Sequence, residues 1–81
     1  MPTMQKQTRQ KPWIDLKGLR ESRGWMQHEA AERLGFARSY VTLVESGRQG
    51  ISVKMMHAII RVFDVQYEDF YASGRSSAKI R

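Results

Sequence analysis

The sequence predicts a compact all-α domain of five short helices. Apolar residues recur at helical spacing through residues 14–71, and no segment shows the alternation of a half-buried strand. Glycines at 24, 35 and 47 stand where three of the helices should end. A length of 81 residues suits one small domain, which we place at 13–72. Residues 1–12 and 73–81 are expected to be a disordered basic arm and a disordered basic tail.

The first three helices are expected at residues 14–22, 27–34 and 38–45. Leu16 and Leu19 are core positions of the first. Gly35 separates the second and third, because a helix commonly ends at a residue that tolerates positive φ. Met26 and Ala37, which precede these two helices, are poor N-caps. We therefore expect tertiary packing to hold both helices in place.

The fourth helix is expected at residues 53–63, after the N-cap Ser52, and a fifth at 67–71. The fourth carries two apolar stripes, and a small domain should bury only one of them, formed by Val53, Met56, Ile60 and Phe63. The second stripe is expected to be exposed beside the fifth helix. Together they predict a homodimer interface of Met55, Ile59, Val62, Tyr67, Phe70 and Tyr71. The alternative is that Ile59 belongs to the core.

Composition argues against several classes of protein. There is no cysteine, and His28 and His57 lack a ligand motif, so we expect no metal and no cofactor. Neither a nucleophile–base pair nor a phosphate loop can be assembled, which argues against an enzyme and leaves no small-molecule substrate evident. No apolar run approaches a membrane span. We expect a soluble cytoplasmic protein.

Charge is distributed unevenly along the chain. The net charge is +6, yet residues 14–71 hold eight basic and eight acidic side chains, so the excess lies in the two ends. Within the domain, Arg20, Arg23, Arg38 and Arg48 flank the segment 27–46, whereas Asp64, Glu68 and Asp69 cluster near its C-terminal end. This distribution favours a basic side around residues 27–46.

The pattern of residues 27–46 predicts two short helices joined by a tight turn. Val41 and Val44 mark the buried side of the second helix of this unit. The side chains left outside are Arg38, Ser39, Tyr40, Thr42 and Leu43. A short helix presented in this way can enter the DNA major groove. The alternative is an αα-corner inside any small helical protein.

Three segments carry a resemblance to a known family. They are LKGLRESRGWMQHEAAERLG (16–35), FARSYVTLVESGRQGISV (36–53) and FDVQYEDFY (63–71). The chain resembles the Xre/Cro-type, lambda-repressor-like helix-turn-helix regulators, and it is similar to small controller, plasmid and phage regulators. The resemblance implies a five-helix domain, usually dimeric, that binds operator DNA and represses or activates transcription.

The resemblance also implies roles for single residues. Gln27 matches a position that contacts a phosphate and supports the recognition helix. Arg38, Ser39 and Thr42 match positions that read base edges, Leu43 one that touches a thymine methyl, and Tyr40 one that faces groove or backbone. Ser46 and Arg48 match backbone-contact positions. Arg20 and Glu45 match a pair that links the first helix to the end of the third inside the fold.

The sequence departs from the family pattern at three positions. Ser or Thr is usual at Met26 and Ala37, so a phosphate contact from a cap hydroxyl is lost. Leucine is usual at Ala30, and we expect Trp25 and Phe36 to fill the volume. The leading interpretation is a homodimeric, sequence-specific regulator of a palindromic operator. The alternative is a protein-interaction module, an antitoxin or anti-regulator, that binds a partner through residues 53–71.

Overall fold

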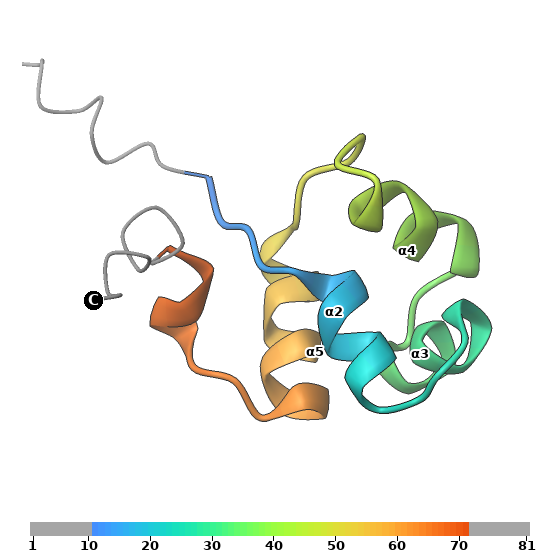
Figure 1. Cartoon of the computed structure of the whole chain (residues 1–81). Coiled ribbons are helices and arrows are strands. Elements are labelled where there is room, and N and C mark those ends of the chain that lie inside the picture. Colours follow the sequence, from blue (N-terminus) through green and yellow to red (C-terminus); the bar gives the residue numbers. More distant parts are fainter. Residues whose placement is uncertain (1–10, 72–81) are drawn as a thin grey trace, which may run out of the picture.

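The computed structural model describes residues 11–71, and the arm and tail expected at the two ends lie almost entirely outside this range. Four α-helices follow one another: α2 (Leu16–Ser22), α3 (Gln27–Leu34), α4 (Arg38–Glu45) and α5 (Val53–Phe63). They are followed by a single 3-10 turn, η1 (Tyr67–Phe70) (Figure 1). The fifth helix expected at residues 67–71 is thus present as this short 3-10 helix, and the described residues form four α-helices. The first helix begins at Leu16 instead of residue 14, after the cap Asp15.

Local capping explains where several of these helices begin and end. The carboxylate of Asp15 accepts a hydrogen bond from the Gly18 amide at 3.0 Å, and the Ser52 hydroxyl accepts one from the Met55 amide at 3.1 Å. Gly35, with φ of 83°, ends α3 in the left-handed conformation. Ala37 makes no side-chain cap, as expected.

Met26 also makes no side-chain cap, but Glu29 satisfies one backbone donor at the start of α3. The Glu29 carboxylate reaches back to accept a hydrogen bond from the Met26 amide at 2.7 Å. This is the acidic half of a capping box. A methionine is thus tolerated before α3 because Glu29 satisfies one backbone donor and also places negative charge in the first turn.

The core lies between α5 and the other elements. Along the chain, α3 packs against both α4 and α5, α2 packs against α4, and η1 packs against α5. Trp25 and Phe36 are partly buried and pack against this core, and Ala30 is fully buried. The Trp13 amide donates to the Phe70 carbonyl at 2.9 Å, which ties the segment before α2 to η1 (Figure 1). No helix in this part of the chain is long and apolar enough to cross a membrane.

The orientation of α5 corrects the expected dimer surface. Met55 and Ile59 are 0% exposed and Phe70 is 1% exposed, so all three belong to the core of the monomer. Val53, expected in the core, is 63% exposed instead. The physical reason is that η1 folds back onto α5 and adds Phe70 to the core, so the domain itself covers Met55 and Ile59 of the second stripe. Of the predicted interface set, Val62, Tyr67 and Tyr71 reach the surface.

Candidate nucleic-acid interface

Two sides of α4 have opposite environments. Val41 and Val44 are fully buried and hold the helix on the core. The other side presents the exposed residues Arg38, Ser39, Thr42 and Leu43, which together line a surface hollow of about 440 Å³. Arg38 lies one turn before Thr42, and Ser39 one turn before Leu43, so the four side chains form two adjacent rows. The structure thus brings together four of the predicted DNA-contacting residues.

The one carboxylate of α4, Glu45, is turned into the domain. The Arg20 Nε donates to Glu45 Oε2 at 2.6 Å and Arg20 Nη2 to Oε1 at 3.1 Å, while Nη1 donates to the Trp25 carbonyl at 2.8 Å. The two side chains are only 11% and 5% exposed. The hydrogen bond that Arg20 donates to Glu45 raises the pKa of Arg20, against the opposing effect of burial. This bidentate pair confirms the predicted link and leaves the outer side of α4 without negative charge.

Gln27 connects this ion pair to the outer side of α4. Its amide nitrogen donates to Glu45 Oε1 at 3.0 Å, and its amide oxygen accepts from the Thr42 hydroxyl at 2.9 Å. The same hydroxyl contacts the Arg38 carbonyl at 3.1 Å. Gln27 therefore fixes the start of α3 relative to α4, which matches the supporting role expected of it.

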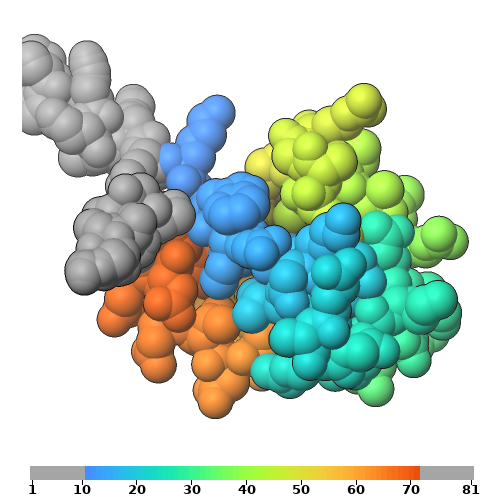
Figure 2. Space-filling model, in the orientation of Figure 1, coloured from blue at the N-terminus to red at the C-terminus, as the bar shows by residue number. Residues whose placement is uncertain are grey.

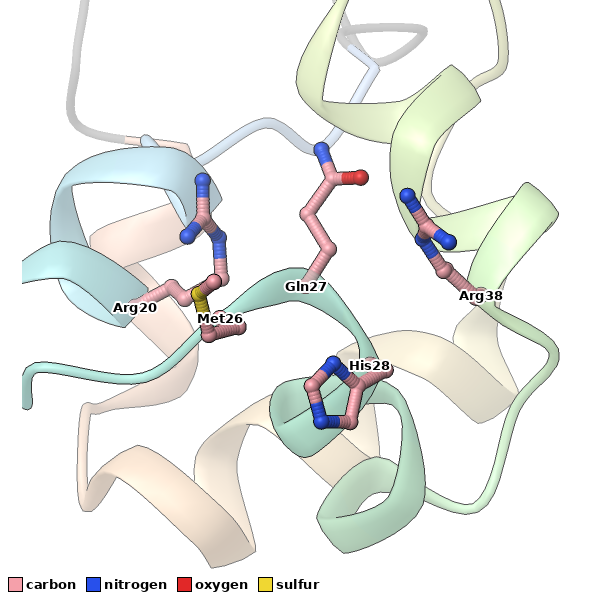
Figure 3. Close-up of a pocket in the computed structure, with 5 residues that line it drawn as sticks. All are labelled: Arg20, Met26, Gln27, His28 and Arg38. Carbon is pink, nitrogen blue, oxygen red and sulfur yellow. The ribbon is translucent and has the colours of Figure 1, made fainter.

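A second hollow, of about 280 Å³, adjoins the start of α3. Its lining residues come from three elements (Figure 3): Arg20, Met26, Gln27, His28 and Arg38. His28 was not among the predicted contact residues. It follows Gln27 in the first turn of α3. This neighbouring position is the feature of the sequence that could have indicated His28 as a lining residue. None of these five lining residues carries a carboxylate.

Tyr40 does not join the other outward residues of α4. Its ring stacks on Phe36 with centroids 5.2 Å apart, and its hydroxyl contacts the Gly50 carbonyl at 3.3 Å and the Ser52 hydroxyl at 3.4 Å. This half-buried side chain fastens α4 to the segment before α5. Helical spacing missed the role because the contacts are made with a distant loop.

The segment after α4 carries the last two predicted contact residues. It stands out from the body of the domain (Figure 2). Ser46 and Arg48 are exposed there, and the Ser46 hydroxyl donates to the Leu43 carbonyl at 3.0 Å. Within residues 11–71, no group of three His, Cys, Asp or Glu side chains is placed to hold a metal ion.

Comparison with known proteins agrees with this geometry. The family described as Helix-turn-helix matches residues 16–70. An uncharacterized HTH-type transcriptional regulator of Archaeoglobus fulgidus is 32% identical over 56 residues, which cover 69% of this chain and 79% of that protein. A second regulator of the same description and organism is 29% identical over 56 residues, covering 69% and 80%. The chain therefore belongs to the helix-turn-helix family, as an Xre-type DNA-binding regulator of transcription.

Proposed function

We propose that this protein binds a palindromic operator as a homodimer, with α4 of each copy in a major groove. The observation that carries the proposal is the composition of the outer side of α4. Arg38, Ser39, Thr42 and Leu43 share one hollow there, and the carboxylate of the helix is withdrawn into a buried ion pair. A surface with a cation, hydroxyls and an apolar group, but no anion, is complementary to base edges in the major groove.

The proposal assigns base readout to the start of α4. Arg38 is its first residue, and an arginine can donate to both O6 and N7 of guanine. Ser39, beside it, can donate to or accept from a base. Gln27 and His28, in the adjoining hollow, and Ser46 and Arg48, in the projecting segment, would contact the sugar–phosphate backbone.

Dimerisation is proposed through the side of the domain formed by η1 and the end of α5. Tyr67 is 56% exposed and its ring lies 5.4 Å from that of Tyr71, and Val62 is half-buried nearby in sequence. Trp13, which is bonded through its backbone to Phe70, adds a further exposed aromatic side chain. A two-fold axis at this surface would let two α4 helices reach grooves ~34 Å apart.

Selection from a random duplex library tests the DNA-binding part. The full chain should enrich an inverted repeat, and titration by fluorescence anisotropy should show preference over a scrambled duplex of the same composition. Equal affinity for the two duplexes would refute sequence-specific binding. Sedimentation equilibrium tests the dimer, and a monomer at tens of micromolar would refute that part alone.

A further inference from the structure

Met26 is an exposed methionine at the start of α3, where a helix usually carries a side chain with an oxygen acceptor. It is the N-cap of α3 and makes no side-chain hydrogen bond to the helix. Its side chain is 60% exposed and lines the second hollow together with four other residues (Figure 3). A thioether that is open to solvent at this place neither caps the helix nor belongs to the core.

Exposure distinguishes Met26 from the other methionines that the structure describes. Met55 is 0% exposed and Met56 is 2% exposed, because both belong to the core. Oxidation to the sulfoxide requires that the oxidant reach the sulfur, so an oxidant in solution should attack Met26 first. Met1 and Met4 lie outside the described residues. Within residues 11–71, Met26 is therefore the methionine that is open to oxidation.

The backbone at the start of α3 offers hydrogen-bond donors beside this sulfur. Within residues 11–71, the backbone amides of Gln27 and His28 have no protein acceptor, whereas the Glu29 amide donates to the Met26 carbonyl at 3.1 Å. The first amides of a helix point out of its N-terminus, toward the N-cap residue. The proposed function assigns this end of α3 to contact with the DNA backbone, whose phosphate oxygens are acceptors for such amides. An acceptor oxygen on the Met26 side chain would lie next to the same donors.

We propose that Met26 is an oxidation-sensitive site, and that its conversion to the sulfoxide by a peroxide lowers the affinity of the protein for DNA. The sulfur lone pair attacks one oxygen of hydrogen peroxide, and the S–O bond forms as the O–O bond breaks. The proton of the transferred oxygen moves to the departing hydroxide to give water, so the sulfur loses two electrons and the peroxide gains them. The product carries a polar acceptor oxygen and no donor. It therefore competes with a phosphate for the amides at the start of α3 and cannot itself donate to the phosphate.

The effect on DNA rests on the proposed function and differs from a loss of base recognition. A phosphate contact carries no sequence information, so oxidation should weaken binding to the selected duplex and to its scrambled counterpart by the same factor. We expect a loss of about tenfold, the effect of removing one hydrogen bond to a charged group. The helical circular dichroism spectrum should not change, because Met26 lies at the surface. Reduction by methionine sulfoxide reductases should restore the affinity, since this oxidation is reversible.

Treatment of the full chain with hydrogen peroxide tests the site. Tandem mass spectrometry follows the gain of one oxygen atom at each methionine and distinguishes Met26 from the neighbouring Trp25. Met26 should be oxidised before Met55 and Met56. Dissociation constants for the two duplexes are then measured by anisotropy before treatment, after treatment and after reduction.

Met26→Leu is the matched control for the wild type. Leucine keeps an apolar side chain of similar size but has no sulfur, and the variant retains Met1 and Met4. Its affinity for each duplex should be the same before and after peroxide. This comparison assigns the change in the wild type to the one sulfur atom of Met26.

The outcomes distinguish this inference from the proposed function. If Met26 is oxidised no faster than Met55, or if its oxidation leaves the affinity unchanged, the inference is wrong and the regulator stands. The inference is also wrong if Met26→Leu loses affinity on treatment, if the oxidised wild type loses its helical spectrum, or if the loss is confined to the selected duplex. If the untreated chain binds neither duplex, the proposed function is wrong and the inference falls with it. Equal loss on both duplexes, its absence in Met26→Leu and its reversal by the reductases would establish the site.

Discussion

Gln27 and Thr42 are joined by a hydrogen bond of 2.9 Å between the side-chain oxygen of one and the hydroxyl of the other. Gln27 also donates to Glu45 at 3.0 Å, and Glu45 is bound by Arg20. One amide therefore connects a buried ion pair to the side chain that lines the exposed hollow of α4. The same contacts therefore link the buried ion pair to the exposed residues of α4.

Gln27→Glu should lower stability and weaken binding to every DNA sequence. The change removes the donor that Glu45 uses and places a second carboxylate beside it. We expect the free energy of unfolding to fall by ~1.5–3 kcal/mol, the typical contribution of a hydrogen bond to a charged group, since Arg20 still donates to the same oxygen. Urea denaturation followed by circular dichroism measures this loss. His28→Gln, at the exposed next residue, is the control and should remain within ~0.5 kcal/mol of the wild type. Equal loss in both variants would refute the explanation.

Arg20→Ala and Glu45→Ala should each destabilise the domain strongly. Either change leaves the partner charge buried without its counterion, which costs ~3–5 kcal/mol when the pair is desolvated. Glu21→Ala provides the comparison: Glu21 lies 3.9 Å from Arg20 but is 58% exposed, so its loss should cost under ~1 kcal/mol. Thermal unfolding distinguishes these cases. Similar melting temperatures for Arg20→Ala and Glu21→Ala would contradict the buried pair.

The contribution of Arg20 to the free energy of unfolding should stay constant between neutral and mildly alkaline pH. The hydrogen bond that this arginine donates to Glu45 raises its pKa in the folded state. A raised cationic pKa stabilises the fold fully below the ordinary arginine pKa and loses its effect only as the pH rises through the folded value. The stability difference between wild type and Arg20→Ala should therefore be constant from about pH 7 to about pH 10. A difference that shrinks over this range would show that the arginine is not the charged partner.

The bounds of α3, α4 and α5 follow from the sequence alone. Each has a local signal: Gly35 must adopt positive φ between the first two, and the Ser52 hydroxyl caps the third. The link between Arg20 and Glu45 came from family resemblance and is confirmed. These features depend on residues a few positions apart or on a pattern of known spacing.

The side of α5 that faces the core could not be predicted in the same way. The sequence favours burial of one of its two apolar stripes, whereas both contribute buried residues because η1 folds back and adds Phe70 to the core. The intramolecular contacts of Tyr40 were missed for a related reason, since its hydroxyl donates to the Gly50 carbonyl, ten residues away. Both errors come from long-range packing that periodicity does not describe.

Arg38→Ala should keep the fold and lose sequence preference. The side chain is exposed at the first position of α4, so its removal costs the core nothing, whereas a bidentate contact to guanine is worth ~1–3 kcal/mol of discrimination. Anisotropy titrations on the selected operator and on its scrambled counterpart measure the ratio of affinities. That ratio should approach one for the variant.

Arg48→Ala is the matched control for Arg38. It removes an exposed arginine from the segment after α4, where we expect phosphate contact. Both duplexes should then bind more weakly by the same factor, and the dependence on salt should become shallower by about one counterion per contact. Uniform weakening by Arg38→Ala as well would show that Arg38 contacts phosphate instead of a base.

Three aspartate substitutions, one of them a control, distinguish loss of folding from loss of dimerisation. Ile59 is fully buried beside Phe70, so Ile59→Asp should unfold the domain by burying an unpaired charge. Tyr67 is 56% exposed, so Tyr67→Asp should keep the helical spectrum but shift the protein to monomer and remove cooperative operator binding. Val53 is the first residue of α5, at the end of that helix farther from η1 along the chain, and it is 63% exposed. Val53→Asp should therefore leave the dimer intact. Sedimentation equilibrium and circular dichroism on the three variants decide the matter. A folded, dimeric Tyr67→Asp would place the contact between copies elsewhere on the domain.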